Sequence, residues 1–199
     1  MSTTAAIASN VQDVATASAA SGATSWDIDT AHTSTLFRVR HLMVSHVRGQ
    51  LGAVTGNLQL DEQDASRSRV DVRIDARQLD TRDAKRDEHL RSADFLDVAR
   101  YPEVAFRSTS VRAARDGGLQ VTGDLTVRDV TRPITLEVDP LSAPVSDPWG
   151  NVKRGATARA SLNRKDFGLV WNVGLETGGV LVGDKVDIEI EVELVRSRA

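Results

Sequence analysis

The feature that most constrains the fold of this chain is an alternation of apolar and polar residues with a period of two. In VDVRIDA (70–76), Val70, Val72 and Ile74 alternate with charged residues, and VDIEIEVELV (186–195) repeats the pattern over a longer stretch. Successive side chains of a β-strand point to opposite faces of its sheet. Each stretch therefore predicts a strand with one buried face and one exposed face.

Several further stretches with this alternation predict a protein made mainly of strands. The connections between them carry turn residues: DGG (116–118) and RDVTRP (128–133) are typical of hairpins, and PLSAPVSDPWGN (140–151) is typical of a proline-rich loop. The eight predicted strands are 33–39, 47–60, 70–76, 103–111, 119–127, 133–139, 153–163 and 186–195.

One stretch, 81–102, lacks the alternation and is rich in helix-forming residues. Asp83 near its start and Pro102 at its end predict one helix, followed by a shorter one that begins near Ser92. The apolar contacts of this stretch would be Leu90, Phe95 and Leu96. The sequence therefore predicts an all-β fold with one helical insertion.

Strands of this number usually close into a barrel, because closure removes the exposed edges of the sheet. The interior of an eight-stranded barrel holds either packed side chains or one small ligand. Large side chains that could fill it are scarce, with four Phe, three Trp and one Tyr in the chain. Glycines at 49, 52, 56 and 123 either bend the strands or leave room inside. The sequence thus allows an apolar ligand cavity, and the alternation alone does not decide how full the barrel is.

The start of the chain differs from the rest. Residues 1–25 are rich in Ala, Ser and Thr and contain neither Lys nor Arg, whereas 26–199 form one predicted domain. A secretory signal needs a positive start and an apolar run, so we expect a disordered tail, with a short helix at 8–17 as the alternative. Because signal features and cysteines are both missing, we expect a cytoplasmic protein, with a periplasmic or extracellular location as the alternative.

Composition argues against several classes of function. A net charge of -3 gives no basic field, so nucleic acid is not an expected partner. A chain without cysteine has no thiolate nucleophile and no zinc–thiolate site. The apolar runs are too short for a transmembrane helix, and neither nucleotide-binding loops nor a nucleophile elbow occur in the sequence.

His41 and His46 raise the question of a metal or catalytic pair. On a single strand their odd spacing would point them to opposite faces, and Ser45 would face away from the neighbouring His46 for the same reason. We therefore expect no metal site and no catalytic residues. The commoner role for His41 is a hydrogen-bonded polar group in the barrel wall.

The stretch SLNRKDFGLVW (161–171) joins polar residues to apolar ones. Asn163 and Asp166 would cap a turn at the end of a strand. Phe167 and Trp171 would cover the end of the barrel, and residues that close a barrel mouth also contact what lies inside.

The stretch RDEHL (86–90) allows two interpretations. Arg86 and Asp87 are either surface ions, which contribute little to stability, or part of a helix that packs Leu90 against the barrel. In the second case His89 or Arg86 would point to a polar headgroup at the rim.

Four segments of the chain share their motifs with one known family. They carry Trp-x-Ile-Asp followed by spaced His and Phe, Arg-Asp-x-His-Leu with Tyr-Pro-x-x-x-Phe, Gly-x-Leu-Thr, and Asn-Arg-x-Asp-Phe-Gly, within residues 26–52, 79–111, 121–138 and 163–171. In this order they resemble the YceI family, the lipocalin-like polyisoprenoid-binding proteins of bacteria. The likeness covers residues 26–196. Thr33 and Asp129 depart from it, standing where the family often has Ser and Gly.

The resemblance implies a closed antiparallel eight-stranded lipocalin-like barrel with a helix packed on its flank. It also implies an apolar tunnel that holds a polyprenyl lipid, an isoprenoid quinone or another long-chain amphiphile, with no further cofactor. His41 would contact the headgroup, and His46 would lie on the surface. The implied ligand-binding residues are Phe37, Val39, His41, Leu42, Met43, Val54, Leu58, Val72, Ile74, Phe106, Leu125, Val127, Phe167 and Trp171.

Three other functions stay open at this point. The tunnel could hold a fatty acid or fatty amide, or the barrel could be an enzyme that acts on a prenyl or quinone substrate with His41 as general acid–base. A fully packed barrel could instead serve as an interaction protein in a stress response. All of these functions are compatible with a monomer or a homodimer.

Overall fold

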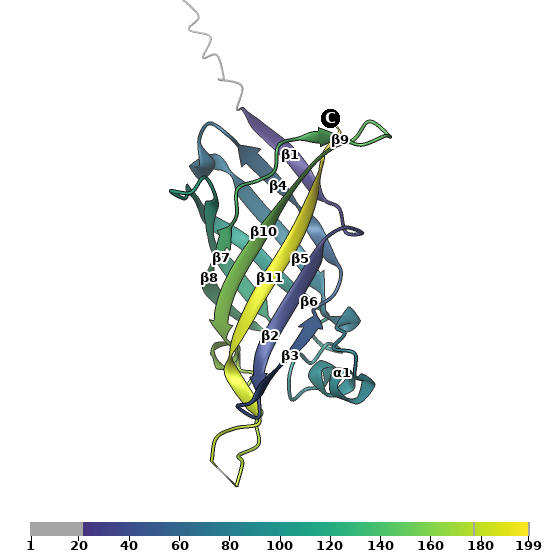
Figure 1. Cartoon of the computed structure of the whole chain (residues 1–199), viewed down its shortest axis with the longest axis vertical. Helices are drawn as coiled ribbons and strands as arrows, with labels where there is room; N and C mark the ends of the chain where they lie inside the picture. The colour runs from purple at the N-terminus through teal and green to yellow at the C-terminus, as the bar shows by residue number, and fades with distance from the viewer. Residues whose placement is uncertain (1–21, 177, 199) are drawn as a thin grey trace, which may run out of the picture.

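The fold is built from long antiparallel strands that wind around a common interior (Figure 1). The computed structural model describes residues 22–176 and 178–198. Its strands are β1 (Ala23–Ile28), β2 (Ser34–His41), β3 (Ser45–Gln50), β4 (Val54–Asp61), β5 (Arg69–Asp75), β6 (Glu103–Ala113), β7 (Leu119–Val127), β8 (Val130–Val138), β9 (Val145–Ser146), β10 (Val152–Asn163) and β11 (Val182–Arg196). Its helical segments are the 3₁₀ turns η1 (Ala65–Arg67), η2 (Ala76–Gln78) and η3 (Arg164–Phe167), and the α-helix α1 (Ala84–Arg91).

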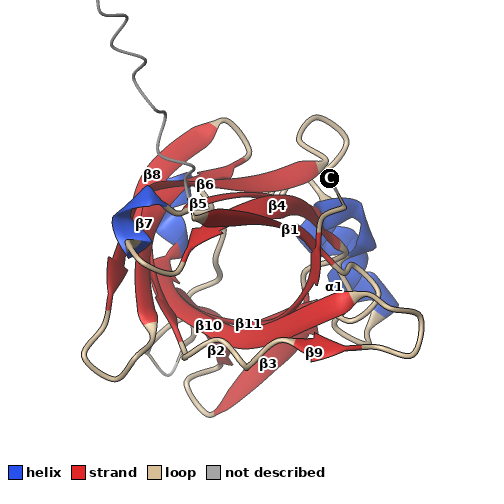
Figure 2. Cartoon of the chain, turned by 90° about the horizontal axis from the view of Figure 1, so that it is seen from above, coloured by secondary structure: helices blue, strands red, loops and turns tan. Residues whose placement is uncertain are grey.

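Eight of these strands close into a barrel. They follow one another in the order β1, β4, β5, β6, β7, β8, β10 and β11, and β11 pairs with β1 again. The β10–β11 seam runs from Lys153 opposite Val195 to Asn163 opposite Lys185. Seen from above, the strands form a ring with α1 outside it (Figure 2). The predicted closed antiparallel barrel with a helix on its flank is confirmed.

β11 is long enough to pair with two strands on the same side. Its C-terminal end pairs with β1, where Leu194 lies opposite Ile28, whereas its part from Val182 to Glu191 pairs with β2. β2 in turn pairs with β3, whose last residue bridges to Asp80 just before α1. The β2–β3 hairpin therefore extends the barrel wall toward the helix.

Residues 47–60, predicted as one strand, form the two strands β3 and β4. At the break, the backbone N–H of Leu51 donates to the carbonyl of Thr35 on β2, at 2.9 Å. Gly52 has a φ of 141° and passes so close to the Asp75 carbonyl that a Cβ would lie 2.0 Å from its oxygen. The glycine thus allows the short connection between β3, which pairs with β2, and β4, which pairs with β5.

β1 is not among the predicted strands, and it begins inside the predicted tail. Residues 23–25 pair with 59–61 of β4, so the predicted boundary after residue 25 is wrong by this short strand segment. These small residues, Ala, Thr and Ser, show no apolar alternation before Trp26, which explains why the pattern missed them. Residues 1–21, with the rest of the predicted tail and its alternative helix, lie outside the described residues.

α1 begins as predicted, because the Asp83 carboxylate caps it and accepts from the Arg86 N–H at 3.1 Å. The second predicted helix is wrong. The backbone N–H groups of Phe95 and Asp97 both donate to the Ser92 carbonyl, and the chain continues in turns. Asp97 has a φ of 48°, a left-handed conformation in which a helix cannot continue. Among the described residues, no helix has the length and apolar character needed to span a bilayer.

Apolar side chains fill the interior in two groups. Trp26, Leu60 and Leu194 form the Trp26 cluster, near the ends of β1, β4 and β11 that lie away from α1 (Figure 1). The larger group is centred on strands β5 to β8 and includes Phe106 and Phe167. The hollow part of the barrel lies within this second group.

Candidate ligand tunnel

An apolar cavity of about 540 Å³ lies inside the half of the barrel next to α1. Alternate residues of six strands face it, because inward side chains recur with a period of two. Those residues are Thr35, Phe37, Val39, Val72, Ile74, Val104, Phe106, Leu125, Val127, Ile134, Leu136, Val186, Ile188 and Ile190. The hydroxyl of Thr35 is buried here without a hydrogen-bond partner among the described residues. The rest of this lining is hydrocarbon, so the cavity favours a hydrophobic occupant.

Two glycines keep bulky rings against the wall of the cavity. A Cβ at Gly49 would lie 2.7 Å from the Phe37 ring, and a Cβ at Gly123 would lie 2.5 Å from the Phe106 ring. Each ring therefore occupies space that a side chain of the neighbouring strand would otherwise fill. Of the two roles open to these glycines from the sequence, making room is the one found at 49 and 123.

The cavity reaches the surface between the end of β2, α1 and the loop that follows η3. Its lining turns polar there, with Arg40, His41, Asp83, Lys85, Arg86 and His89. Asp83 and Lys85 are exposed, and His41 is half-buried. This mouth is the place where a polar group on an otherwise apolar ligand would meet both protein and water.

Three rings meet at the mouth. The His89 ring lies 4.6 Å from the Trp171 ring and 5.1 Å from the Phe95 ring, edge-on in both cases. The Phe95 and Trp171 rings are 5.3 Å apart. Edge-to-face packing of this kind stabilises aromatic pairs. It joins α1, the turns after it and the loop after η3 into one border of the mouth.

Arg86 and Asp87 fix α1 to the chain just before it. The Asp87 carboxylate accepts from the N–H and the hydroxyl of Thr81, at 2.9 Å and 2.5 Å. The Arg86 guanidinium donates to the Thr81 hydroxyl at 2.7 Å and to its carbonyl at 2.8 Å. A buried carboxylate needs such partners, so the interpretation of Asp87 as a surface ion is wrong. Leu90 and His89 line the cavity, as the alternative interpretation expected.

Arg164 holds the loop that carries Trp171. Its guanidinium is buried and donates to the carbonyls of Gly183 and Trp171, each at 2.9 Å, and to the carbonyl of Leu169. Burial lowers the pKa of Arg164, and the Asp184 carboxylate at 3.3 Å opposes this shift. The loop is thereby tied to the start of β11 at the mouth. In the sequence, the Asn-Arg-x-Asp-Phe-Gly motif is a signal that singles out Arg164. No periodic pattern there predicts that its side chain holds a loop.

Most of the residues expected to bind the ligand lie in the lining of the cavity: Phe37, Val39, His41, Val72, Ile74, Phe106, Leu125, Val127, Phe167 and Trp171. Leu42 and Met43 do not, because the chain reverses after His41 and exposes both side chains. Val54 and Leu58 of β4 are also outside the lining. β4 pairs with β1, and Leu58 packs against the Trp26 cluster. Val54 is buried within the larger apolar group but does not face the cavity.

His41 and His46 lie on the two strands of one hairpin and do not meet. His41 pairs with Ser45, Arg40 pairs with His46, and only His41 lines the cavity. His46 is exposed. The expected placement of His41 at the cavity and His46 at the surface agrees with this geometry, while their effect on ligand binding stays a prediction.

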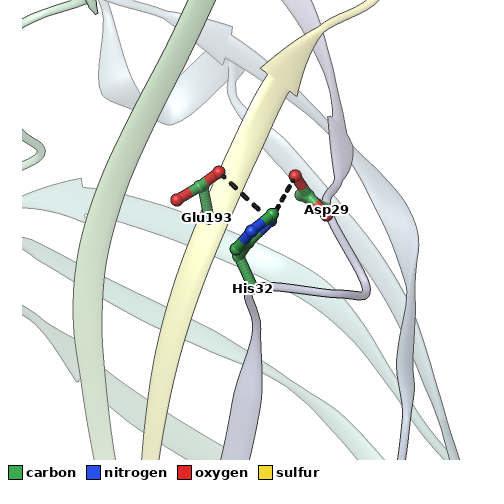
Figure 3. A group of neighbouring side chains, drawn as sticks. All are labelled: Asp29, His32 and Glu193. Carbon is green, nitrogen blue, oxygen red and sulfur yellow. Dashed lines mark hydrogen bonds and ion pairs between the residues drawn. The ribbon is translucent and has the colours of Figure 1, made fainter. Parts of the chain in front are cut away.

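Asp29, which directly follows β1, His32, and Glu193 on β11 bring metal-type donor atoms together (Figure 3). His32 Nδ1 lies 2.9 Å from Asp29 Oδ2 and 3.6 Å from Glu193 Oε1. The Lys153 ammonium also contacts both carboxylates, at 2.9 Å and 2.6 Å. Lys153 lowers the pKa of Asp29, and the two carboxylates raise the pKa of Lys153. The group is therefore an ion-pair network in which the Lys153 ammonium, itself a cation, already contacts both carboxylates.

The fold and its cavity define a closed antiparallel β-barrel with an apolar tunnel that opens at one end. The sequence pattern of the YceI-like domain matches residues 26–194. Protein YceI of Escherichia coli is 38% identical over 172 residues, which cover 86% of each chain. The chain therefore belongs to the YceI-like family.

Several solved structures share the fold, and two of them illustrate the likeness. BcnA of Burkholderia cenocepacia has a TM-score of 0.71 at 19% identity, covering 84% of this chain and 99% of that one. A polyisoprenoid-binding domain from Saccharophagus degradans has a TM-score of 0.62 at 13% identity, covering 86% and 98%. Both likenesses confirm the barrel architecture.

Proposed function

We propose that this protein binds an isoprenoid lipid, either a polyprenyl lipid or an isoprenoid quinone, in the tunnel and carries or stores it unchanged. The main support for this proposal is the distribution of polar side chains around the tunnel. Apolar side chains of the strands line its interior, and charged side chains gather at its mouth. Such a site suits a molecule with a long apolar tail and a polar head. Membership of the YceI-like family and the description of the Saccharophagus domain support a polyisoprenoid as the occupant.

Burial of the tail is sufficient to hold such a ligand. Each buried methylene contributes about 0.8 kcal/mol, so a five-carbon isoprene unit contributes about 4 kcal/mol before the cost of immobilising the chain. The affinity then comes mainly from the tail. The mouth, with His41 and Lys85, selects more weakly among headgroups.

Mass spectrometry of the purified protein, under native and then denaturing conditions with organic extraction, tests the proposal. We expect a stoichiometric polyprenyl or quinone species, and a rise in Tm when polyprenol or quinone is added to the lipid-free protein. A fatty acid or fatty amide as the sole extracted species would keep the tunnel as a lipid site and overturn the isoprenoid assignment. No extracted lipid and no rise in Tm would overturn both.

The non-enzymatic part of the proposal has its own test. The extracted ligand is incubated with the protein and followed by mass spectrometry over time. We expect it to remain unchanged. Conversion of the ligand that stops in a His41→Ala variant would show that the barrel is an enzyme with His41 as its acid–base group.

A further inference from the structure

Five large apolar side chains are exposed beside the mouth of the tunnel. Leu42, Met43 and Val44 form the β2–β3 turn, with 39%, 50% and 78% of their surface exposed. Val170 and Val173 lie in the loop after η3, with 64% and 46% exposed. Exposed apolar residues that cluster around a ligand opening mark an interaction surface more often than singly scattered ones do.

The two segments form one continuous surface, called the apolar rim below. The Leu42 N–H donates to the Leu181 carbonyl at 2.9 Å, and the Leu181 N–H donates to the Val173 carbonyl at 2.9 Å. A Cβ at Gly179 would lie 3.4 Å from Met43 Cγ, so the turn also touches the far side of the loop. Because Leu181 itself lines the tunnel, the apolar rim borders directly on the mouth.

The turn of the apolar rim is held in a shape that favours exposure. Leu42 and Met43 have φ values of 50° and 62°, in the left-handed region that non-glycine residues rarely adopt. The Arg40 guanidinium donates twice to the Met43 carbonyl, at 3.1 Å and 2.6 Å, and the Val44 N–H donates to the His41 carbonyl. A strained turn that presents apolar side chains to solvent points to a role outside the fold.

Several basic side chains lie beside the apolar rim although the whole chain has a net charge of -3. Arg40 and Lys85 line the mouth, and Arg48 is exposed on β3. The pKa of His46 is lowered by desolvation and by the positive charges of Arg38, Arg40 and Arg48, opposed by Asp187. Acidic groups also lie close by: Asp83 at the mouth, the exposed Asp166 and Glu176 before and within the loop after η3, and Asp184, which pairs with Arg164 and Lys165.

We propose that the apolar rim docks on a lipid bilayer that carries anionic headgroups. The valine, leucine and methionine side chains would enter the interface, the basic groups would face the lipid phosphates, and the mouth would open toward the bilayer. A ligand would then pass between bilayer and tunnel without crossing water. This last consequence rests on the proposed function, whereas the docking itself does not.

Co-sedimentation with vesicles tests the docking. One set of vesicles contains phosphatidylcholine alone, and the other contains equal parts of phosphatidylcholine and phosphatidylglycerol. We expect the full chain to bind the anionic vesicles and to lose binding as salt rises. Met43→Ser with Val44→Ser should weaken this binding about tenfold or more. Val145→Ser with Trp149→Ser, which removes apolar residues of 64% and 80% exposure in and after β9, should leave it unchanged.

A site-specific probe gives an independent readout. The chain has no cysteine, so Met43→Cys and Val145→Cys each accept a single environment-sensitive dye. We expect a blue shift on anionic vesicles for the first variant and none for the second. No shift at either position, or equal vesicle binding by the two serine double variants, would overturn the proposal.

Two further outcomes separate the possible failures. A chain that ignores vesicles but changes from dimer to monomer on Met43→Ser with Val44→Ser would show that the apolar rim joins two copies, which overturns the proposal. Vesicle binding by a protein that yields no extractable lipid would support docking and contradict the proposed function. An extractable lipid in a protein that does not bind vesicles would support the proposed function and contradict the docking.

Discussion

The two ends of the barrel share the long strand β11 and are built from the same kinds of residue, yet one is packed and the other is hollow. On β11, Val192 and Leu194 pack with the Trp26 cluster, whereas Val186, Ile188 and Ile190 line the tunnel. At the packed end, one buried tryptophan occupies the interior. At the hollow end, glycines leave space in which phenylalanine rings lie against the barrel wall. An inward apolar pattern therefore identifies the interior of a barrel, and the placement of a few large and very small residues decides whether that interior is filled.

Creating a cavity at the packed end should have the largest effect on stability. Trp26 is 2% exposed, and its indole N–H donates to the Thr24 hydroxyl at 2.8 Å. We expect Trp26→Ala to lower the free energy of unfolding by about 3–5 kcal/mol, measured by urea denaturation. Trp149→Ala, at an 80% exposed position, is the control and should change it by less than about 0.5 kcal/mol. Similar losses in both variants would contradict the description of this end as packed.

Filling the hollow end should separate stability from binding. We expect Ile188→Trp to occupy the tunnel, to reduce lipid retention about tenfold or more, and to change the free energy of unfolding by less than about 1 kcal/mol. Leu194→Trp introduces the same side chain at the packed end and should cost about 1–3 kcal/mol through overpacking. Retention is followed by extraction and mass spectrometry, and stability by urea unfolding. If Ile188→Trp were the more destabilising variant, the cavity would not have the room assigned to it.

The two histidines of the β2–β3 hairpin sharpen the comparison at the mouth. His41 lines the tunnel and His46 is exposed on the opposite strand. We expect His41→Ala to weaken ligand retention by about 1 kcal/mol, roughly fivefold, through loss of a polar contact to the headgroup. His46→Ala should leave retention intact. Equal losses from both variants would undo the assignment of His41.

The smallest expected effect is electrostatic and belongs to the packed end. Asp29 has its pKa held below the ordinary 3.8 by Lys153 and His32. A carboxylate with a lowered pKa in the folded state adds stability above that ordinary pKa, and this stability is lost as the pH falls below it. Lys153→Met should therefore be less stable than the wild type at neutral pH, with the difference shrinking as the pH falls below 3.8.

Urea midpoints measured from neutral pH down to about pH 3 follow this difference. Lipid retention at neutral pH should be the same in Lys153→Met and the wild type, because the network lies outside the tunnel lining. A difference that grows on acidification would mean that the network does not stabilise the folded state in the way described.

Much of the barrel could be predicted because alternation is a local property of each strand. The inward positions Val72, Ile74, Val186 and Ile188 follow from period two alone, and all of them line the tunnel. The pattern fails where the chain changes partner or direction. It ran through the break at Gly52. The family resemblance, carried over residue by residue, likewise placed Leu42 and Met43 in the tunnel, although the chain reverses after His41 and exposes both side chains.

The rest of the site depends on contacts that no short pattern encodes. Leu51, Leu79 and Leu181 line the tunnel from turns and loops, where side-chain direction has no period. Arg164 stabilises the mouth through backbone carbonyls that any sequence would supply. Whether the barrel is open depends on Gly49 and Gly123 lying beside Phe37 and Phe106, a relation between strands that only the register reveals.

Because the barrel is packed at one end and hollow at the other, a ligand enters and leaves the tunnel in a defined direction. The packing around Trp26 fills the interior at one end, and the cavity reaches the surface beside α1 at the other. A chain-like guest must then withdraw in the reverse order of its insertion, with its outermost part leaving first. Its length is also gauged against the distance to the block, so a longer guest keeps its excess outside, at the surface where the apolar rim lies.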